Sequence, residues 1–329
     1  MPEQSRLADP SLAAKDEHAA LTRANSRDES IQHVALAITV QEPRPWQVSV
    51  QHAGRALSRG GSRFFCMGAS QTATLESRCE LLRSLHRPGD PLLLPNAWDV
   101  ASARAVVAAG FPVVATTSWG VAAMLGHEDH ADAPGDDMLG SAARIAGDLD
   151  VPVTVDAEAG YDMNPAELVA LLRSAGFAGC NLEDTDHATG GLRDPDRQAE
   201  WLGAVREAAA KQGYGLVINA RVDTFFGPWL AGDGAHAGSQ EELVEDAVRR
   251  ANAYLEAGVD CVYPIVLWET GALESFMSAV RGAVNVVRLP QGHSVAELAG
   301  LGVARVSWGP ILYRETMAYF QDRLASIRE

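Results

Sequence analysis

The sequence predicts a (β/α)8 TIM-type barrel, an α/β fold, and three observations support it. Short apolar stretches alternate with helical ones from about residue 75 onward. Eight such strand–helix units fill about 240 residues, the usual length of this fold. Several predicted helices end in a glycine directly before a strand, namely Gly110, Gly176, Gly258 and Gly302. Glycine accepts the left-handed conformation common at helix C-termini. A doubly wound open sheet is the weaker alternative, because no GxGxxG follows the first strand.

The predicted strands are apolar throughout, as parallel strands covered on both faces should be. They are Leu92–Leu94, Val113–Thr116, Val153–Val155, Gly179–Leu182, Leu216–Asn219, Cys261–Tyr263, Val284–Val287 and Ala304–Ser307. The predicted helices are Ser77–Leu85, Val100–Ala109, Asp137–Asp148, Pro165–Ala175, Pro195–Lys211, Gln240–Ala257, Thr270–Val280, Val295–Leu301 and Pro310–Ser326. The glycine- and alanine-rich segment Gly227–Ser239 is expected to be a surface loop.

Composition limits the domain organisation and the partners. The 329 residues are 47% hydrophobic, which suits one large domain with an appendage. Residues 1–75 are expected to be a disordered extension and residues 76–329 the catalytic barrel. A net charge of −16 argues against nucleic acid as a partner, and no apolar run reaches the roughly 20 residues of a membrane span. The four cysteines lack paired spacing, which favours a reducing cytoplasm.

Two carboxylates end the apolar stretch Val151–Val155. Asp156 and Glu158 are two residues apart, so on an extended chain they point to the same side. Two acids on one face repel each other unless a cation lies between them. Hard carboxylate oxygens suit Mg²⁺ or Mn²⁺. A strand that simply runs into a polar loop is the alternative for this stretch alone.

Polar residues at other strand ends extend this pair to a candidate site, because a parallel barrel carries its active site at the C-terminal ends of its strands. Glu183 would complete the metal site. Arg221 would offer a forked donor to a carboxylate or developing oxyanion. Thr117 and Ser118 could donate to a carboxylate through their hydroxyl and backbone N–H groups. The expected ligand is a small 2-oxo acid that chelates the metal. A solvated rim with mutual salt bridges is the alternative.

Further residue types narrow the chemistry. Asn219 and Trp98 lie at the same rim and are candidate substrate contacts, although a tryptophan there more often fills the barrel mouth. The only lysines are Lys15, in the extension, and Lys211, at a helix end on the face opposite the site. A Schiff-base aldolase, which needs a lysine in the site, is therefore excluded.

Six short motifs follow one another from about residue 85 to residue 326. They are Pro95–Asp99, Thr116–Ser118 followed by Leu125–Gly126, Asp156–Tyr161, Asn181–Asp184, Gly190–Asp194 and Ile218–Asp223. In this order they resemble the isocitrate lyase/phosphoenolpyruvate mutase superfamily. The resemblance implies an Mg²⁺-dependent barrel that acts on C–C or P–C bonds of 2-oxo or 2-hydroxy acids.

The resemblance also assigns roles to individual residues. It implies a direct metal ligand at Asp156 and mostly water-mediated contacts from Glu158 and Glu183. Asp129 matches an acidic position that the family places over the substrate. Family members commonly exchange their last helix between subunits, so we expect a homodimer or homotetramer with a swapped C-terminal helix. The apolar residues of that helix suit this exchange, but they equally suit packing on its own barrel.

The sequence departs from the family in the loop after the fourth strand. Lyases of the family carry a catalytic cysteine there, in a Lys-Cys-Gly-His setting, and the phosphonate branch usually has lysine and asparagine. Thr185–Gly191 reads Thr-Asp-His-Ala-Thr-Gly-Gly and holds none of these. Cys180 is expected to point away from the site, which disfavours cysteine-dependent isocitrate or methylisocitrate cleavage. His187 or Asp129 is the candidate acid–base group, although a loop histidine is more often polar surface.

We therefore expect an Mg²⁺-dependent carbon–carbon lyase that acts beside a 2-oxo acid through an enolate, by retro-aldol cleavage or decarboxylation. The first alternative is P–C chemistry, as a mutase or hydrolase of phosphoenolpyruvate or phosphonopyruvate. A phosphonate would need an extra cation near the lid, and Arg193 is the obvious one. The second alternative is a barrel that binds a small acid without turning it over.

Overall fold

The computed structural model describes residues 73–129, 133–231 and 239–327. They belong to one compact unit, Ala73–Glu329. The predicted extension 1–75 lies outside the described residues except for its last three, of which Leu75 already begins a helix. None of the described helices is long and apolar enough to cross a membrane.

Among the described residues, eight parallel strands form a closed ring, which confirms the predicted barrel. Pro95 splits the first strand into β1 (Leu92–Leu94), which pairs with β11, and β2 (Asn96–Ala97), which pairs with β3. The ring continues through β3 (Val114–Thr116), β4 (Val153–Asp156), β5 (Gly179–Glu183), β8 (Val217–Val222), β9 (Cys261–Pro264), β10 (Asn285–Val287) and β11 (Arg305–Ser307). A parallel bridge from Val262 to Val284 joins β9 to the start of β10 and closes the ring.

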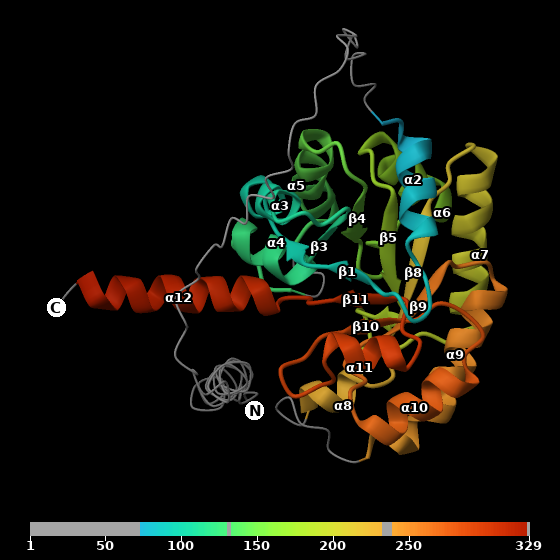
Figure 1. Ribbon diagram of the computed structural model, residues 1–329. Coiled ribbons are helices and arrows are strands. Elements are labelled where there is room, and N and C mark those ends of the chain that lie inside the picture. The colour runs from blue at the N-terminus through green and yellow to red at the C-terminus, as the bar shows by residue number, and fades with distance from the viewer. Residues whose placement is uncertain (1–72, 130–132, 232–238, 328–329) are drawn as a thin grey trace, which may run out of the picture. The chain divides into compact units, whose positions relative to one another are not determined.

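Helices surround the strands, as Figure 1 shows. They include α3 (Val100–Ala108), α5 (Gly135–Asp148), α6 (Pro165–Ser174), α7 (Pro195–Lys211), α9 (Val244–Glu256), α10 (Thr270–Ala279) and α11 (Val295–Gly300). Each lies within a predicted helix or differs from it by a few residues at its ends. The predicted helix Gln240–Ala257 instead begins as a 3-10 turn, η1 (Gln240–Leu243). The glycines predicted to be left-handed, Gly110, Gly176, Gly258 and Gly302, have φ values of 92°, 81°, 95° and 84°.

Two further helices were not predicted. Helix α4 (Ser118–Leu125) begins directly after β3, is apolar along nearly its whole length, and has no side-chain cap at Thr117. It therefore shows neither a start signal nor an amphipathic period. Helix α8 (Phe226–Ala231) occupies the start of the segment Gly227–Ser239, so the prediction of a plain loop is wrong there. Residues 232–238 lie outside the described residues.

Helix α2 (Leu75–Ser84) covers the N-terminal end of the barrel. Leu82 is fully buried, and a Cβ atom on Gly179 would lie 2.8 Å from its Cδ2 atom, so only glycine permits this approach. Arg83 Nε lies 2.7 Å from Asp260 Oδ1, which ties the helix to the turn before β9. Lys211 ends α7 on this side and pairs with Glu207. The opposite end, at the strand C-termini, is left for the site.

A single buried amide links the first and last strands. Asn96 Nδ2 donates to the Thr116 carbonyl at 2.7 Å. Its Oδ1 atom accepts from the N–H groups of Trp308 and Gly309 at 2.8 and 2.9 Å. Because Thr116 ends β3 and the other two partners follow β11, the side chain joins three strand ends at the seam of the barrel.

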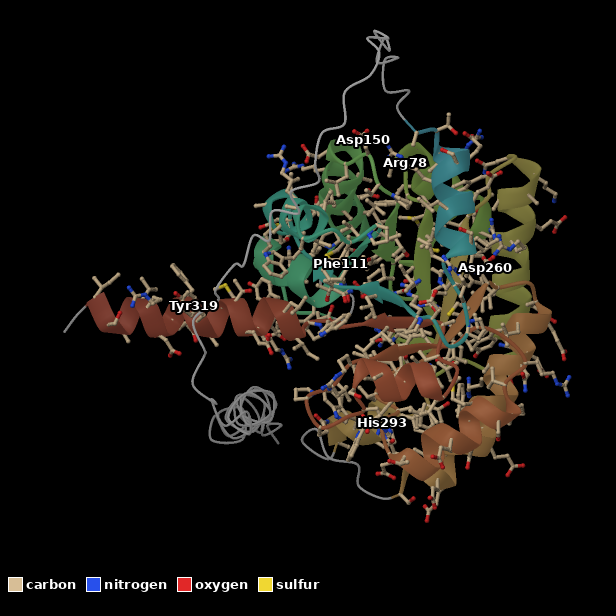
Figure 2. All side chains as sticks on the ribbon, in the orientation of Figure 1. Arg78, Phe111, Asp150, Asp260, His293 and Tyr319 are labelled. Atoms are coloured by element: carbon tan, nitrogen blue, oxygen red, sulfur yellow. The ribbon has the colours of Figure 1, made fainter. Side chains whose placement is uncertain are left out.

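Helix α12 (Ile311–Ile327) runs outward from the barrel (Figure 1). Tyr319 lies well out along it in Figure 2 and is 68% exposed, and Phe320 is 52% exposed. The predicted exchange of this helix between subunits involves a second chain, so it stays a prediction.

Candidate active site

The C-terminal ends of β4, β5 and β8 lie side by side at the rim. In the strand register, Asp156 of β4 is opposite Asn181 of β5, and Glu183 of β5 is opposite Arg221 of β8. The structure thus brings together the residues that were predicted from the ends of three separate strands.

Asp156 is held by the neighbouring strand end. Its N–H donates to Thr116 Oγ1 at 2.9 Å. Its Oδ2 atom accepts from the Ser118 N–H at 3.1 Å, at the N-terminus of α4. Its Oδ1 atom is buried and has no hydrogen-bond partner among the described residues. One carboxylate oxygen is therefore oriented by the protein while the other is left for a ligand.

Glu158 reaches the same cluster by a different route from the predicted one. The strand ends at Asp156, and Glu158 adopts a left-handed φ of 46°, which is uncommon for a residue other than glycine. The prediction that both acids face one side of an extended chain is therefore wrong in its geometry. Glu158 is 3% exposed, and its Oε1 atom accepts from the Tyr161 hydroxyl at 3.1 Å. Burial, then the charges of Asp129 and Glu183, raise the pKa of Glu158 to about 8.

Glu183, Arg221 and Asp223 form a buried ion network. Glu183 Oε2 lies 2.6 Å from Arg221 Nη1, a contact that is close but not a well-directed hydrogen bond. Arg221 Nε and Nη2 donate to the two Asp223 oxygens at 2.6 and 2.9 Å. Burial alone would lower the pKa of Arg221, but Asp223 and Glu183 raise it well above its usual value. The Nε and Nη2 side of the guanidinium, which was expected to bind the substrate, thus binds Asp223. The N–H groups that remain on Nη1 and Nη2 are the ones that a substrate could use.

Asp223 was not among the predicted site residues, although the sequence holds a signal for it. Residues two apart on a strand point to the same side, so Asp223 follows Arg221 toward the rim. Behind it, Asp184 accepts from the Asp223 N–H at 2.8 Å and from the Tyr254 hydroxyl at 2.7 Å. Arg250 Nη1 lies 3.2 Å from the same carboxylate. Burial raises the pKa of Asp184 to about 6.

The predicted lid segment is a small antiparallel hairpin of β6 (Thr185–Asp186) and β7 (Gly191–Leu192). It brings His187 Nε2 to 2.8 Å from Glu183 Oε1. This close contact with the Glu183 carboxylate raises the pKa of His187. Thr185 Oγ1 donates to Asp223 Oδ2 at 2.5 Å. The hairpin is thus docked on the buried ion network, with His187 at the site.

The other predicted residues occupy different positions. Thr117 is buried at the start of α4, and Asn219 is fully buried below the rim, where its Nδ2 atom donates to Asn181 Oδ1 at 2.8 Å. Trp98 packs its ring on Tyr313. Cys180 is fully buried, and burial raises its pKa to about 12, which suits packing rather than nucleophilic chemistry. Asn219 is therefore placed to support the strands beneath the site.

The acids at the rim offer donors that suit a divalent metal. Among the residues 73–129, 133–231 and 239–327, no three acids, histidines or cysteines form a ready-made cage. The donors nevertheless suit a hard cation that keeps several waters. Asp156 offers a buried carboxylate oxygen without a partner, and Glu158 and Glu183 lie close enough for Glu183 to raise the pKa of Glu158. A cation at Asp156 would offset this repulsion.

The chain is similar to a group of known proteins. The family model of phosphoenolpyruvate phosphomutase matches residues 82–328. An uncharacterized protein of Mycobacterium tuberculosis is 35% identical over 229 residues, which cover 70% of this chain and 81% of that protein. The "Probable 2-methylisocitrate lyase 1" of Corynebacterium glutamicum is 28% identical over 245 residues, 72% of this chain and 77% of that protein. The crystal structure of a candidate phosphonomutase from Burkholderia cenocepacia J2315 is 39% identical, with a TM-score of 0.69, and covers 75% of this chain and 99% of that one.

Proposed function

The chain belongs to the isocitrate lyase/phosphoenolpyruvate mutase superfamily, and on that premise we propose an Mg²⁺-dependent lyase that acts beside a 2-oxo acid. Relatives named as lyases and mutases support a carbon–carbon lyase. The observation that carries the metal-dependent chemistry is the partnerless Asp156 Oδ1 atom, buried beside Glu158 and Glu183. A small 2-oxo or 2-hydroxy acid is the proposed substrate.

When bound at Asp156, the cation would polarise the substrate carbonyl and stabilise the enolate charge. The chain's own residues supply the rest. The Ser118 N–H keeps Asp156 in orientation, and Arg221, fixed by its two carboxylate partners, directs its remaining N–H groups at the substrate carboxylate. Because Glu183 holds its Nε2 atom, His187 is fixed at the site, where it can move a proton.

The proton and electron balance fits two reactions. In a retro-aldol cleavage of a 2-hydroxy diacid, a proton leaves the 2-hydroxyl, the C–C bond breaks, and the hydroxyl carbon becomes the carbonyl of the 2-oxo acid. The electron pair of the broken bond passes into the enolate of the departing carboxylate, which then takes up a proton at carbon. In a decarboxylation, carbon dioxide leaves instead, and the enolate then takes up a proton at carbon. Both reactions need the same enolate stabilisation and one mobile proton, which His187 would carry, with Asp129 as the other candidate.

Substitution of Asp156 tests the proposal. We expect Asp156→Asn to lower kcat/KM by about a thousand-fold, as loss of a single group that stabilises transition-state charge does. Release of pyruvate from oxaloacetate, methylisocitrate, dimethylmalate and phosphonopyruvate measures activity, with Mg²⁺ and with a chelator. Asp148→Asn, at an exposed pair with Arg104, is the matched control. Full Mg²⁺ binding and activity in Asp156→Asn would refute the metal assignment.

P–C chemistry is the second candidate, supported by the candidate phosphonomutase at 39% identity. The cation predicted for it is engaged elsewhere, which weighs against it. Arg193 donates to Gln198 Oε1 at 3.3 Å and to the Ala159 carbonyl at 3.4 Å, and it lies over the Trp201 ring. Conversion of phosphonopyruvate, with no turnover of carbon acids, would favour this candidate. Metal binding without turnover of any acid would instead favour the non-catalytic barrel.

A further inference from the structure

A substrate with two anionic groups needs a second cation at the rim, and the arginines closest to the acids are already engaged. Arg221 is held by Glu183 and Asp223. Arg193 contacts Gln198 and Trp201, and Arg250 pairs with Asp184 and Asp246. Arg288 donates to the adjacent Leu289 carbonyl. Arg305 is fully buried at the start of β11 and donates to Asn181, although its Nε and Nη1 atoms have no partner among the described residues. Arg314 differs from these arginines because an aromatic ring beside the site holds it.

Arg314 lies in the first turn of α12, immediately after the loop that follows β11. Its Cζ atom is 4.7 Å from the centroid of the Trp119 ring, a cation–π contact. Its side chain is half-buried, and its guanidinium makes no hydrogen bond or ion pair with any described residue. The charge is thus positioned by a ring face, and no described residue accepts from its five N–H donors.

An aromatic cluster of Trp98, Trp119 and Tyr313 fixes the position of Arg314. The Tyr313 ring meets Trp98 and Trp119 nearly edge-on, at centroid distances of 5.1 and 5.3 Å. A Cβ atom on Gly120 would lie 2.9 Å from Trp98 Cβ and 3.4 Å from Tyr313 Cδ2. Glycine at this position therefore lets the first turn of α12 settle onto α4.

The aromatic cluster lies at the same rim of the barrel as the acids. Trp98 and Trp119 follow β2 and β3, and Ser118, adjacent to Trp119, donates its N–H to Asp156. The charge of Asp129 acts both on Arg314 and on Glu158. Burial lowers the pKa of Arg314, and Asp129 opposes that shift. Arg314 and Glu158 therefore both lie within electrostatic reach of Asp129.

We propose that Arg314 is a specificity-determining residue that binds the second carboxylate of a 2-hydroxy or 2-oxo diacid. This inference rests on the proposed function, because the first carboxylate is taken to bind beside the metal. A guanidinium binds a carboxylate through two parallel N–H bonds, and its stacking on Trp119 holds the fork in one plane. A substrate with a single carboxylate gains nothing from Arg314.

Binding of L-malate and L-lactate, measured by titration calorimetry with Mg²⁺ present, tests this inference. Both are 2-hydroxy acids, and L-malate carries the additional carboxylate. We expect the wild-type protein to bind malate about ten-fold or more tightly than lactate, as one charge-assisted bidentate pair allows. Arg314→Gln should abolish this preference while lactate binding stays within about two-fold, and Arg314→Lys should keep part of it.

Arg323→Gln is the matched control, because it removes the same charge from an exposed position of the same helix. An unchanged preference in Arg314→Gln, an equal loss for both ligands, or no preference in the wild-type protein would overturn the inference. The outcome is distinguishable from that of the proposed function. A malate preference that depends on Arg314, in a protein that turns over no 2-oxo acid, would support this inference and refute the lyase.

Discussion

Two halves of the rim differ in how their charges are balanced. In the balanced half, Glu183 and Asp223 flank Arg221, and His187 contacts Glu183. In the acidic half, formed by Asp129, Asp156 and Glu158, burial and then repulsion by the neighbouring carboxylates raise the pKa of Glu158 to about 8. In the balanced half, every charged side chain is paired with another residue of this chain. The acidic half is stable as a set of charges only with a cation, so it indicates where a ligand binds.

The balanced half should be the more sensitive to mutation. Arg221→Met leaves Glu183 and Asp223 buried without their counter-charge, and removal of one partner of a buried pair costs about 3–5 kcal/mol. Urea denaturation measures this change in the free energy of unfolding. Arg104→Met, at an exposed pair with Asp148, should change it little. Equal effects of the two substitutions would mean that the network at Arg221 is not a buried charge network.

His86, which lies outside both halves, also makes the free energy of unfolding depend on pH. Burial, and then the charge of Arg305, lower the pKa of His86 from 6.5 to about 4, while its Nδ1 atom donates to the Leu82 carbonyl. Between these pH values the unfolded chain binds a proton that the folded protein rejects. Stability should therefore fall as the pH drops from 6.5 to 4, by about 3 kcal/mol at most.

Urea denaturation of the metal-free protein at a series of pH values measures this loss. His86→Gln should remove it, and the remaining slope then reports on the carboxylates of the rim. Identical slopes in the two proteins would show that His86 titrates normally in the folded state.

The acidic half should respond to the metal. At a Mg²⁺ concentration of about 100 times Kd, binding to the folded protein alone stabilises it by about 2.7 kcal/mol. The rise in Tm on addition of Mg²⁺ measures this effect, and it should disappear in Asp156→Asn and persist in Asp148→Asn. A rise that survives the loss of Asp156 would place the metal elsewhere and end the distinction between the halves.

Local signals were sufficient to predict the barrel but not every element. The eight strands are short apolar runs, and the glycines before β3, β5, β9 and β11 are left-handed as predicted. Helix α4 lacked both a cap and a polar face, so nothing in its sequence separated it from the preceding strand. The first residue of α4 is Ser118, whose N–H donates to Asp156. The direction of this N–H depends on how α4 packs, which the sequence does not reveal.

The site was predicted where a strand end determines it. Glu183 and Arg221 lie side by side because their strands are parallel neighbours in register. Glu158 required the left-handed turn after Asp156, which has no sequence signal in a glutamate. Arg314 could not be found from the sequence, because its place at the rim depends on the direction in which α12 leaves the barrel. Magnesium, oligomeric state and cytoplasmic localisation stay predictions.

The Asn96 amide has a consequence for synthesis of the protein. Its partner Trp308 is 212 residues further along the chain, so the seam cannot close until the last strand has been made. Until then the first strand keeps an open edge, which other chains can pair with, and closure of so long a loop slows folding. A nascent chain that lacks β11 has two unpaired strand edges, at β1 and β10, and is the kind of intermediate that chaperones bind.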